Sequence, residues 1–389
     1  MEIKNDNNGG ARYLVMLGLL GMLTALAPVV NNMFSPAMPA IMAAFGVSKA
    51  SVQMGLTACM IGLAVGQLVL GPLSDRYGRR PVLLISMGAF VVCSAVLVVC
   101  SSLSWFIALR LLQGLSASGG IVISRSMATD VASDRALLRM LAVINVINGV
   151  MPIVTPVAGA SACAAWGWQG VMACMAVVGV VLALGCLTLR ETLPSERRVR
   201  KAWIARPYIT LLTRKSFVST VLHQGGALGV LFGNIAATPF LVGHYGMAPS
   251  MTGVLLAVNG VFTALGAGLA GAMRDARRGV ALTSVGLPVL ALLLVSSVLW
   301  LDNVWAYEAV MCAMLALVGV TLTSSSTRAM DVARDQAGTG SALLGAIGFV
   351  MGAIVAPLIG VGSLLWAVAA TMLAMALWAA SWGWVSVKS

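Results

Sequence analysis

Long apolar runs separated by short polar stretches fill almost the whole chain. Windows of about 19 residues pick out twelve such runs, each close to the roughly 20 residues that a helix needs to cross the hydrocarbon core of a bilayer. The expected spans are 13–34, 52–72, 81–101, 105–126, 137–160, 169–190, 216–241, 250–272, 280–300, 304–327, 337–360 and 363–385. No stretch has the composition of a separate water-soluble domain. The pattern predicts an all-α membrane protein with twelve transmembrane helices.

The longest polar segment, 191–215, lies between the sixth and seventh runs. We interpret it as a cytoplasmic linker between two six-helix bundles, residues 1–190 and 216–389. The sequence GPLSD at 71–75 recurs 200 positions later as GAMRD at 271–275, each time after the second run of its half. This offset supports a duplicated six-helix unit, and therefore two pseudo-symmetric bundles.

Composition and charge exclude most classes of soluble protein. Hydrophobic residues make up 60% of the 389 positions and charged residues 9%, whereas an average soluble domain has about 25% charged residues. The formal charge of +12 would suggest a nucleic-acid partner for a soluble chain. Here 22 of the 24 Lys and Arg residues fall on one side of the predicted membrane, with Lys49 on the other side and Arg110 inside a span. The positive-inside rule places both termini in the cytoplasm, and no nucleic-acid partner is expected.

The sequence offers little catalytic apparatus. It has two histidines, neither of them in an H-E-x-x-H motif, and it has no G-x-S-x-G and no G-x-x-x-x-G-K-(S/T) motif. Its seven cysteines lie in or beside apolar runs without the CxxC spacing of a metal site, so they are expected to be small core residues. We expect no enzyme activity, no metal and no cofactor.

The loop between the second and third runs, 71–81, carries the most specific pattern. Gly71 allows close approach of helices, Gly78 supplies the positive φ of a tight turn, and Asp75 offers a carboxylate for pairing with Arg. The basic residues of this loop are Arg76, Arg79 and Arg80. The loop matches the form G-x-L-(A/S)-D-R-x-G-R-(R/K), and by this motif the chain resembles the major facilitator superfamily.

Two further motifs resemble the Bcr/CflA-type drug:proton antiporters of that superfamily. RLLQG at 110–114 is similar to the R-x-x-Q-G motif of span four, and ETLP at 191–194 is similar to the end of the first half in this subgroup. The resemblance implies a transporter that exports small organic molecules by proton antiport through alternating access, with roles in multidrug efflux and antibiotic resistance. It further implies a monomer in the bacterial inner membrane whose partners are a small-molecule substrate, protons and the lipid bilayer.

Two departures from the subgroup bear on the mechanism. In span five, G-P-x-x-G-G becomes TPVAGA at 155–160, which keeps Pro156 and Gly159; because Pro152 lies one turn earlier, a helix bend is still expected. In span one, Asn32 stands where the subgroup has an acid in Asp-Met-Tyr-Leu-Pro-Ala. An amide does not titrate in this range. The alternative is therefore a metabolite importer or facilitator of the same fold without proton coupling through span one.

Arg110 is the clearest ionisable residue inside a span. It is either a side chain that snorkels to the membrane surface or a substrate-binding residue that faces a cavity near Asn31 and Asn32. Because neither Asn offers a carboxylate, Arg110 would be free to meet an anionic or zwitterionic group of the substrate. Gln113 of the same motif belongs to the predicted substrate-binding set.

Glu308 and His223 are the candidates for proton coupling. Ten of the twelve acids lie on the cytoplasmic side, which leaves Asp302 in an outer loop and Glu308 about one turn inside span ten. Glu308 is either a rim carboxylate in water or a replacement proton carrier. His223 lies about two turns into span seven and His244 near the outer end of that span. Either histidine could relay protons, and a hydrogen-bonding role is the alternative.

The loop 71–81 is also predicted to gate transport together with residues at the inner end of span four. We expect Asp75 and Asp130 to pair with Arg residues across the cytoplasmic surface and so to latch the outward-facing state. A solvated hairpin that only obeys the positive-inside rule is the alternative. The predicted gating set is Gly71, Asp75, Arg76, Gly78, Arg79, Arg80, Arg125 and Asp130.

Overall fold

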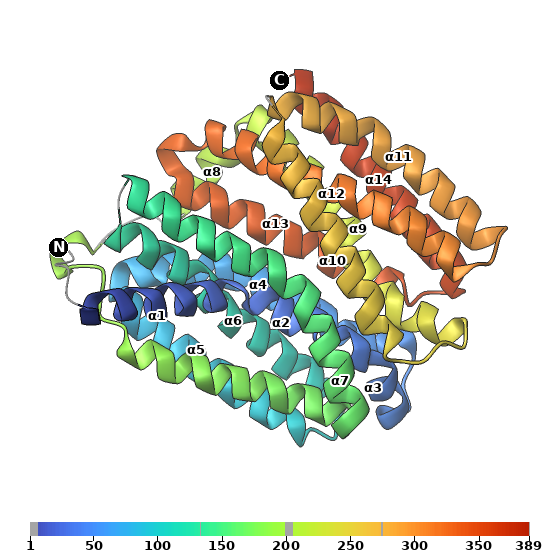
Figure 1. Cartoon of the computed structure of the whole chain (residues 1–389), viewed down its shortest axis with the longest axis horizontal. Helices are drawn as coiled ribbons and strands as arrows, with labels where there is room; N and C mark the ends of the chain where they lie inside the picture. The colour runs from blue at the N-terminus through green and yellow to red at the C-terminus, as the bar shows by residue number, and fades with distance from the viewer. Residues whose placement is uncertain (1–6, 133, 199–204, 274, 389) are drawn as a thin grey trace.

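The computed structural model describes residues 7–132, 134–198, 205–273 and 275–388, and these residues form helices joined by short loops (Figure 1). Among them, ten helices are long and apolar enough to cross a membrane, and a bent pair near the N-terminus forms an eleventh span. The label α7 covers two spans, since the helical backbone is interrupted at Gly167. The twelve predicted spans are therefore confirmed, and the fold is all-α.

The first six spans lie in α1 to α7. Their bounds are α1 Asn7–Thr24, α2 Leu26–Asn32, the 3₁₀ turn η1 Ser35–Ala37, α3 Met38–Phe45, α4 Lys49–Tyr77, α5 Arg79–Val98, α6 Leu103–Val131 and α7 Asp134–Thr188. The first span is bent by 42° between Val15–Thr24 and Leu26–Phe45. Pro28 contributes to this bend, because it has no N–H to donate to the carbonyl of Thr24.

Gly167 turns α7 back on itself. Its φ of 69° and ψ of −171° are not helical, and glycine adopts such angles without the steric penalty of a side chain. The chain on either side is long enough for a span of about 20 residues. Pro152 and Pro156 lie in the part of α7 whose backbone angles are helical. The bend expected at these prolines therefore stays a prediction, while the observed break lies farther along the chain.

The last six spans lie in α9 to α14. Their bounds are α9 Lys215–His244, α10 Met251–Ala272, α11 Ala276–Leu299, α12 Val304–Val332, η3 Arg334–Gln336, α13 Ala337–Leu358 and α14 Leu364–Lys388. The segment expected to be a linker contains η2 Ser195–Arg197 and the short helix α8 Ala205–Leu212, which the sequence pattern did not predict. Tyr208 of α8 donates from its hydroxyl to the carbonyl of Leu68, 3.3 Å away, so α8 contacts the first half.

The two sets of helices meet along two pairs. In the first set, α4, α5, α6 and α7 pack on one another, and in the second α9, α10, α11, α12 and α14 do so; α4 with α13 and α7 with α10 form the main contacts between the sets. Two glycines of α13 and one just after it permit close approach to α4. Gly345 lies against Gln67, Gly352 against Met60 and Gly360 against Ala50. Figure 1 shows α13 running beside α4 at the centre of the molecule.

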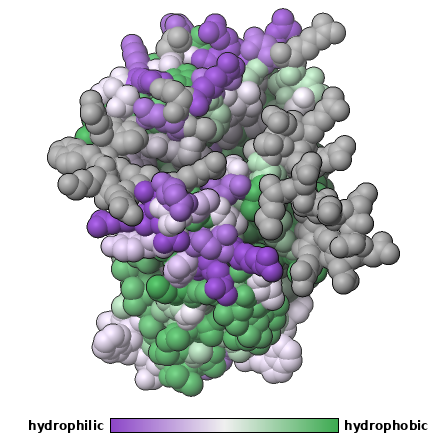
Figure 2. Space-filling model, turned by 90° about the vertical axis from the view of Figure 1, so that its left-hand side faces the viewer, coloured by the Kyte–Doolittle hydropathy of each residue, from purple (hydrophilic) through white to green (hydrophobic). Residues whose placement is uncertain are grey.

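The surface has a polar end and apolar sides. We call the end that carries Arg76 to Arg80 and Arg277 the arginine-rich end, and the other the opposite end. Figure 2 looks onto the arginine-rich end and shows hydrophilic residues gathered there, above an apolar flank. Along α11 the exposed apolar side chains recur every three or four positions, at Leu282, Val285, Val289 and Leu292. This stripe is the lipid-facing side of α11.

Candidate functional site

Arg79 is the centre of a charged cluster at the arginine-rich end. It is the first residue of α5 and its side chain is 9% exposed. One guanidinium nitrogen bonds to Asp75 Oδ1 of α4 at 2.5 Å and to Ser74 Oγ at 2.7 Å, and Nε bonds to Asp130 Oδ2 of α6 at 3.0 Å. One arginine thus joins the ends of three helices, and we call Arg79, Asp75 and Asp130 the arginine clamp. Charge-assisted bonds of this kind are stronger than neutral ones.

Glu191, which follows α7, caps the same helix end from a distance in sequence. Its carboxylate accepts from the backbone N–H of Arg79 at 3.0 Å and of Arg80 at 3.2 Å. These are donors at the start of α5 that have no partner inside the helix. A negative charge at a helix N-terminus also interacts favourably with the helix dipole. The ETLP segment is therefore part of the loop structure.

Gly78 makes the turn between α4 and α5. Its φ is 105° and its ψ 150°, and a Cβ there would lie against the carboxylate of Glu191 and the guanidinium of Arg198. The remaining basic residues play smaller parts. Arg76 stacks 5.3 Å from the ring centre of Tyr77, and Arg80 donates to the carbonyl of Leu187 at 3.1 Å.

The clamp lies within the first half. Asp75 and Asp130 do pair with an arginine, as expected, but with the same one, and in the described chain no residue of the second half takes part in either ion pair. Both expected ion pairs are therefore present, and they join helices of the first half; that they latch the outward-facing state stays a prediction. Arg125 is exposed and has no ion pair in the described part of α6. The gating role of the set stays a prediction.

Arg110 is fully buried inside the first half. Its guanidinium donates to the carbonyl of Val30 at 2.8 Å, to that of Gly55 at 3.3 Å and to Gln113 Oε1 at 2.5 Å, and it stacks 4.2 Å from the ring centre of Phe34. The side chain is 0% exposed, so it does not snorkel to the surface. All three of its nitrogens have protein partners. In this structure Arg110 is therefore not free to meet a substrate anion, and it joins α2, α4 and α6.

Gln113 extends this network. Its amide nitrogen donates to Ser94 Oγ of α5 at 2.7 Å, and Ser94 donates to the carbonyl of Phe90. Asn31 and Asn32 are both buried. Neither the oxygen nor the nitrogen of the Asn31 side-chain amide has a hydrogen-bond partner among the described residues. Leaving a buried polar group unpaired costs about 1–3 kcal/mol. The structure therefore separates Arg110 and Gln113, which are bonded to protein, from Asn31, which is available for a ligand.

Polar groups also meet inside the second half, where the sequence had singled out Glu308 and the two histidines. Asn234 of α9 accepts the hydroxyl proton of Tyr307 of α12 at 2.8 Å, and its own amide nitrogen has no described partner. Asn259 of α10 lies beside Cys312, whose sulfur is 3.6 Å from Asn259 Oδ1 and 3.9 Å from Glu308 Oε1. A survey of every Asn inside an expected span would have found Asn234 and Asn259, since an amide buried in a bilayer needs a partner.

Glu308 is the one buried carboxylate among the residues whose burial the structure describes. It lies one turn into α12 and is 6% exposed. Its Oε2 has no hydrogen-bond partner within the described ranges. The interpretation as a rim carboxylate in water is therefore wrong for this structure. A carboxyl group with a free oxygen and no cationic partner can hold or release a proton.

The two histidines differ in their surroundings. His223 is 0% exposed, with Nδ1 2.6 Å from the carbonyl of Ala379 on α14 and Nε2 3.2 Å from Thr283 Oγ1 on α11. Because a carbonyl only accepts, Nδ1 carries the hydrogen in this geometry. His223 thus joins three helices of the second half. His244 is exposed at the end of α9 and lies against Tyr245.

The two halves are joined by hydrogen bonds toward the opposite end. Ser35 Oγ donates to the carbonyl of Ile235 at 2.5 Å, and Gln53 Nε2 donates to that of Ala236 at 3.4 Å. Gly159 of α7 lies against the backbone of Met33, and Gly253 of α10 lies against the backbone carbonyl of Pro156. The residues expected to bend α7 therefore lie at contacts with the first span and with the second half.

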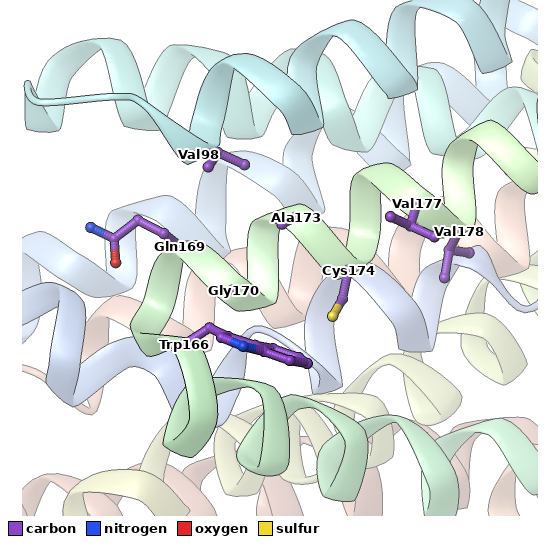
Figure 3. A pocket seen from close by; sticks show the side chains of 8 residues that line it. All are labelled: Val98, Trp166, Gln169, Gly170, Ala173, Cys174, Val177 and Val178. Carbon is purple, nitrogen blue, oxygen red and sulfur yellow. The ribbon is translucent and has the colours of Figure 1, made fainter.

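An apolar groove of about 630 Å³ opens beside the turn at Gly167. Figure 3 shows Val98 approaching it from α5, Trp166 just before the turn, and the remaining lining residues along the part of α7 that follows Gly167. The lining residues are Val98, Trp166, Gln169, Gly170, Ala173, Cys174, Val177 and Val178. The groove contains no predicted transport residue, so the candidate site remains the buried polar groups between the helices.

Comparison with known proteins fits this architecture. Residues 20–357 match the family model described as the Major Facilitator Superfamily. A Bacillus subtilis (strain 168) protein named as an uncharacterized MFS-type transporter, YdgK, is 32% identical over 365 residues, which cover 91% of this chain and 90% of the relative. A Haemophilus influenzae protein named bicyclomycin resistance protein homolog is 26% identical over 359 residues, 87% of each chain. Multidrug resistance protein D of Escherichia coli (strain K12) is 27% identical over 345 residues, 86% of each chain.

The fold is also found among solved structures. A bacterial homolog of the human lysosomal transporter Spinster, in an inward-facing and unoccupied conformation, aligns with a TM-score of 0.73 over 96% of both chains. The sequence identity is 17%, so this likeness concerns the fold alone. Family, fold and transmembrane arrangement agree, and the chain belongs to the major facilitator superfamily: it is a multi-pass membrane transporter of small molecules, not an enzyme.

Proposed function

We propose that the protein exports small organic molecules, drugs or metabolites, by proton antiport through alternating access. The relatives named for bicyclomycin resistance and multidrug resistance support efflux, because they align with most of this chain. In this proposal residues 1–190 and 216–389 are the moving bundles and 191–215 is the linker. The protein works as a monomer in the bacterial inner membrane, with both termini in the cytoplasm.

Glu308 is the observation on which the proton step rests. Among the residues whose burial the structure describes, Glu308 is the one buried carboxylate. Its Oε2 has no hydrogen-bond partner there. A carboxyl group in this position changes its charge when it takes up or releases a proton, and burial makes that change depend on whether water or substrate reaches it. The sulfur of Cys312 lies 3.9 Å from the other oxygen of Glu308, Oε1, and 3.6 Å from Oδ1 of Asn259.

The other ionisable groups inside the spans fit this role less well. Both ring nitrogens of His223 are bonded within the second half, and every nitrogen of Arg110 is bonded within the first. Glu308 is therefore the proton carrier in our proposal, and Arg110 has a structural role.

A second candidate function is transport without proton coupling. Asn32 stands where related exporters have an acid, and it cannot release a proton. If Glu308 serves only to bind substrate, the same fold would act as an importer or facilitator of a metabolite. The two candidates differ in whether a pH gradient alone can drive accumulation of substrate.

The test uses purified protein in proteoliposomes with a trapped pH-sensitive dye. A panel that includes bicyclomycin, cationic dyes and nucleosides is offered under an imposed pH gradient. We expect uphill movement of at least one compound with counterflow of protons. The Glu308→Gln variant should still exchange substrate across the membrane but lose about tenfold or more of the pH-driven accumulation.

Glu196→Gln is the matched control, because Glu196 is exposed in η2, outside the membrane-spanning helices. It should leave both activities unchanged. If Glu308→Gln still moves substrate uphill with release of protons, Glu308 is not the carrier. If flux of the wild-type protein is independent of the pH gradient, the facilitator is the correct function.

A further inference from the structure

Three arginines lie at the arginine-rich end of the second half. Arg277 and Arg278 lie in the first turn of α11, and Arg328 lies in the last two turns of α12. One guanidinium nitrogen of Arg328, Nη2, donates to the carbonyl of Ser386 on α14 at 2.5 Å. The other, Nη1, is buried and has no hydrogen-bond partner in the part of the chain that the structure describes.

This cluster lacks the carboxylates that balance the arginines of the first half. The charge of Arg328 is repelled by Arg277 and attracted by Asp275. Asp275 is nearby, but its Oδ1 accepts from the backbone N–H of Arg277 at 2.8 Å and caps α11. Among the described residues, no carboxylate lies within ion-pair distance of Arg277, Arg278 or Arg328. An anion from outside the chain would supply the missing charge and an acceptor for Arg328 Nη1.

The position of the cluster indicates what that anion is. Arg278 is one turn before Leu282, so it lies at the end of the exposed apolar stripe of α11. An acyl chain can lie along Leu282, Val285 and Val289 while its headgroup stays at the level of Arg278. Trp384 of α14, which packs beside α11 (Figure 1), is 45% exposed at the same end. Tryptophan is enriched at this depth in membranes, where headgroups meet the hydrocarbon core.

We propose that this cluster binds the phosphate of an anionic phospholipid. Arg277 and Arg278 approach the phosphate from α11 and Arg328 from α12, while one acyl chain follows the apolar stripe of α11. Arginine is suited to this because its planar guanidinium can give two parallel hydrogen bonds to a phosphate. Lipid bound here would join α11, α12 and α14 by an external anion, as the arginine clamp joins α4, α5 and α6 by its own carboxylates.

The test compares lipids of identical acyl chains in nanodiscs. Phosphatidylglycerol should raise the midpoint of thermal unfolding above its value in phosphatidylcholine, and native mass spectrometry should detect retained phosphatidylglycerol. Inorganic phosphate added to phosphatidylcholine discs should not reproduce the rise. The Arg277→Gln, Arg328→Gln double variant should lower the retained phosphatidylglycerol about tenfold, as expected for the loss of charge-assisted bonds.

Arg334→Gln is the matched control. Arg334 lies at the same end of the second half, but it is paired with Asp331 at 2.9 Å. Arg278→Gln, at an exposed position, replaces the double variant if that protein does not fold, and it should lower retention about threefold. Equal behaviour in the two lipids, an equal effect of inorganic phosphate, or an equal loss with Arg334→Gln would each overturn the lipid site. None of these results depends on whether transport is coupled to protons.

Discussion

The loops after the second and the eighth spans have related sequences but differ in how their arginines are paired with carboxylates. In the loop 71–80, Arg79 binds Asp75 and Asp130, and Glu191 caps the next helix. In the loop 271–278, Asp275 caps α11 itself, and Arg277 has no carboxylate within ion-pair distance among the described residues. The second loop thus has an acid and a helix cap, but in the described chain it has no counterpart of the arginine clamp. The first half therefore carries its charge balance internally, whereas the second depends on its surroundings.

Replacing Arg79 by Ala should have the largest effect on this comparison. The change leaves Asp130 and Asp75 without their cation, and breaking a partly buried pair in this way costs about 3 kcal/mol. The same change at Arg277, whose side chain has no carboxylate partner in the described chain, should cost less than about 0.5 kcal/mol. Thermal unfolding of both purified variants in phosphatidylcholine nanodiscs measures the difference. Similar losses for the two would remove the distinction between the loops.

Gly78→Ala should have an intermediate effect. A residue with a side chain is strained at φ 105°, and its Cβ would press against Glu191 and Arg198, so we expect a loss of about 2 kcal/mol. Gly271, at the corresponding loop of the second half, lies in α10 with open space around it. Gly271→Ala should therefore stabilise the protein by about 0.5 kcal/mol, because Ala favours the helix. Changes of the same sign, measured by thermal unfolding, would contradict this difference.

Glu191→Gln should have the smallest of the three effects. The amide keeps one acceptor for the N–H groups of Arg79 and Arg80 but loses the negative charge at the start of α5, at a cost of about 1 kcal/mol. In the second loop, Asp275→Asn should change stability by only a few tenths of a kcal/mol, since Asn caps helices as well as Asp. Raising the salt concentration should reduce the first effect. Salt-independent losses of equal size would show that the charge of Glu191 does not matter.

The spans could be predicted from the sequence because the bilayer imposes their length and apolar character on each helix separately. The partners of Asp75 and Asp130 could be predicted only as arginine in general. Choosing Arg79 requires knowing that α4, α5 and α6 end side by side. Glu191 lies 112 positions from Arg79, so neither spacing nor periodicity connects the two residues. The sequence predicted a loop between the spans 137–160 and 169–190, whereas the helices continue up to Gly167 on both sides. A single glycine in the sequence does not indicate such a tight turn.

The candidate site was harder to predict than the fold. Arg110 was expected to face a cavity, because an arginine inside a span usually marks a function. It donates to the backbone carbonyls of Val30 and Gly55. Every residue has a backbone carbonyl, so the sequence cannot show which ones accept a hydrogen bond from Arg110. Asn234 and Tyr307 are bonded across α9 and α12, and each is an ordinary residue within its own run. Only the packing of the helices brings such residues together.

The partners of Arg110 also determine the order in which the protein can be assembled. Inserting an arginine at the centre of a helix costs about 2.5 kcal/mol or more on the insertion scale. Val30 and Gly55, the partners of Arg110 on other helices, both precede it in the chain. During synthesis these acceptors are already present when α6 leaves the ribosome. The guanidinium of Arg110 can therefore bond to helices that were inserted earlier. Every other helix that bonds to the guanidinium of Arg110 in the described structure is thus made before α6, so the charge has acceptors when α6 enters the bilayer.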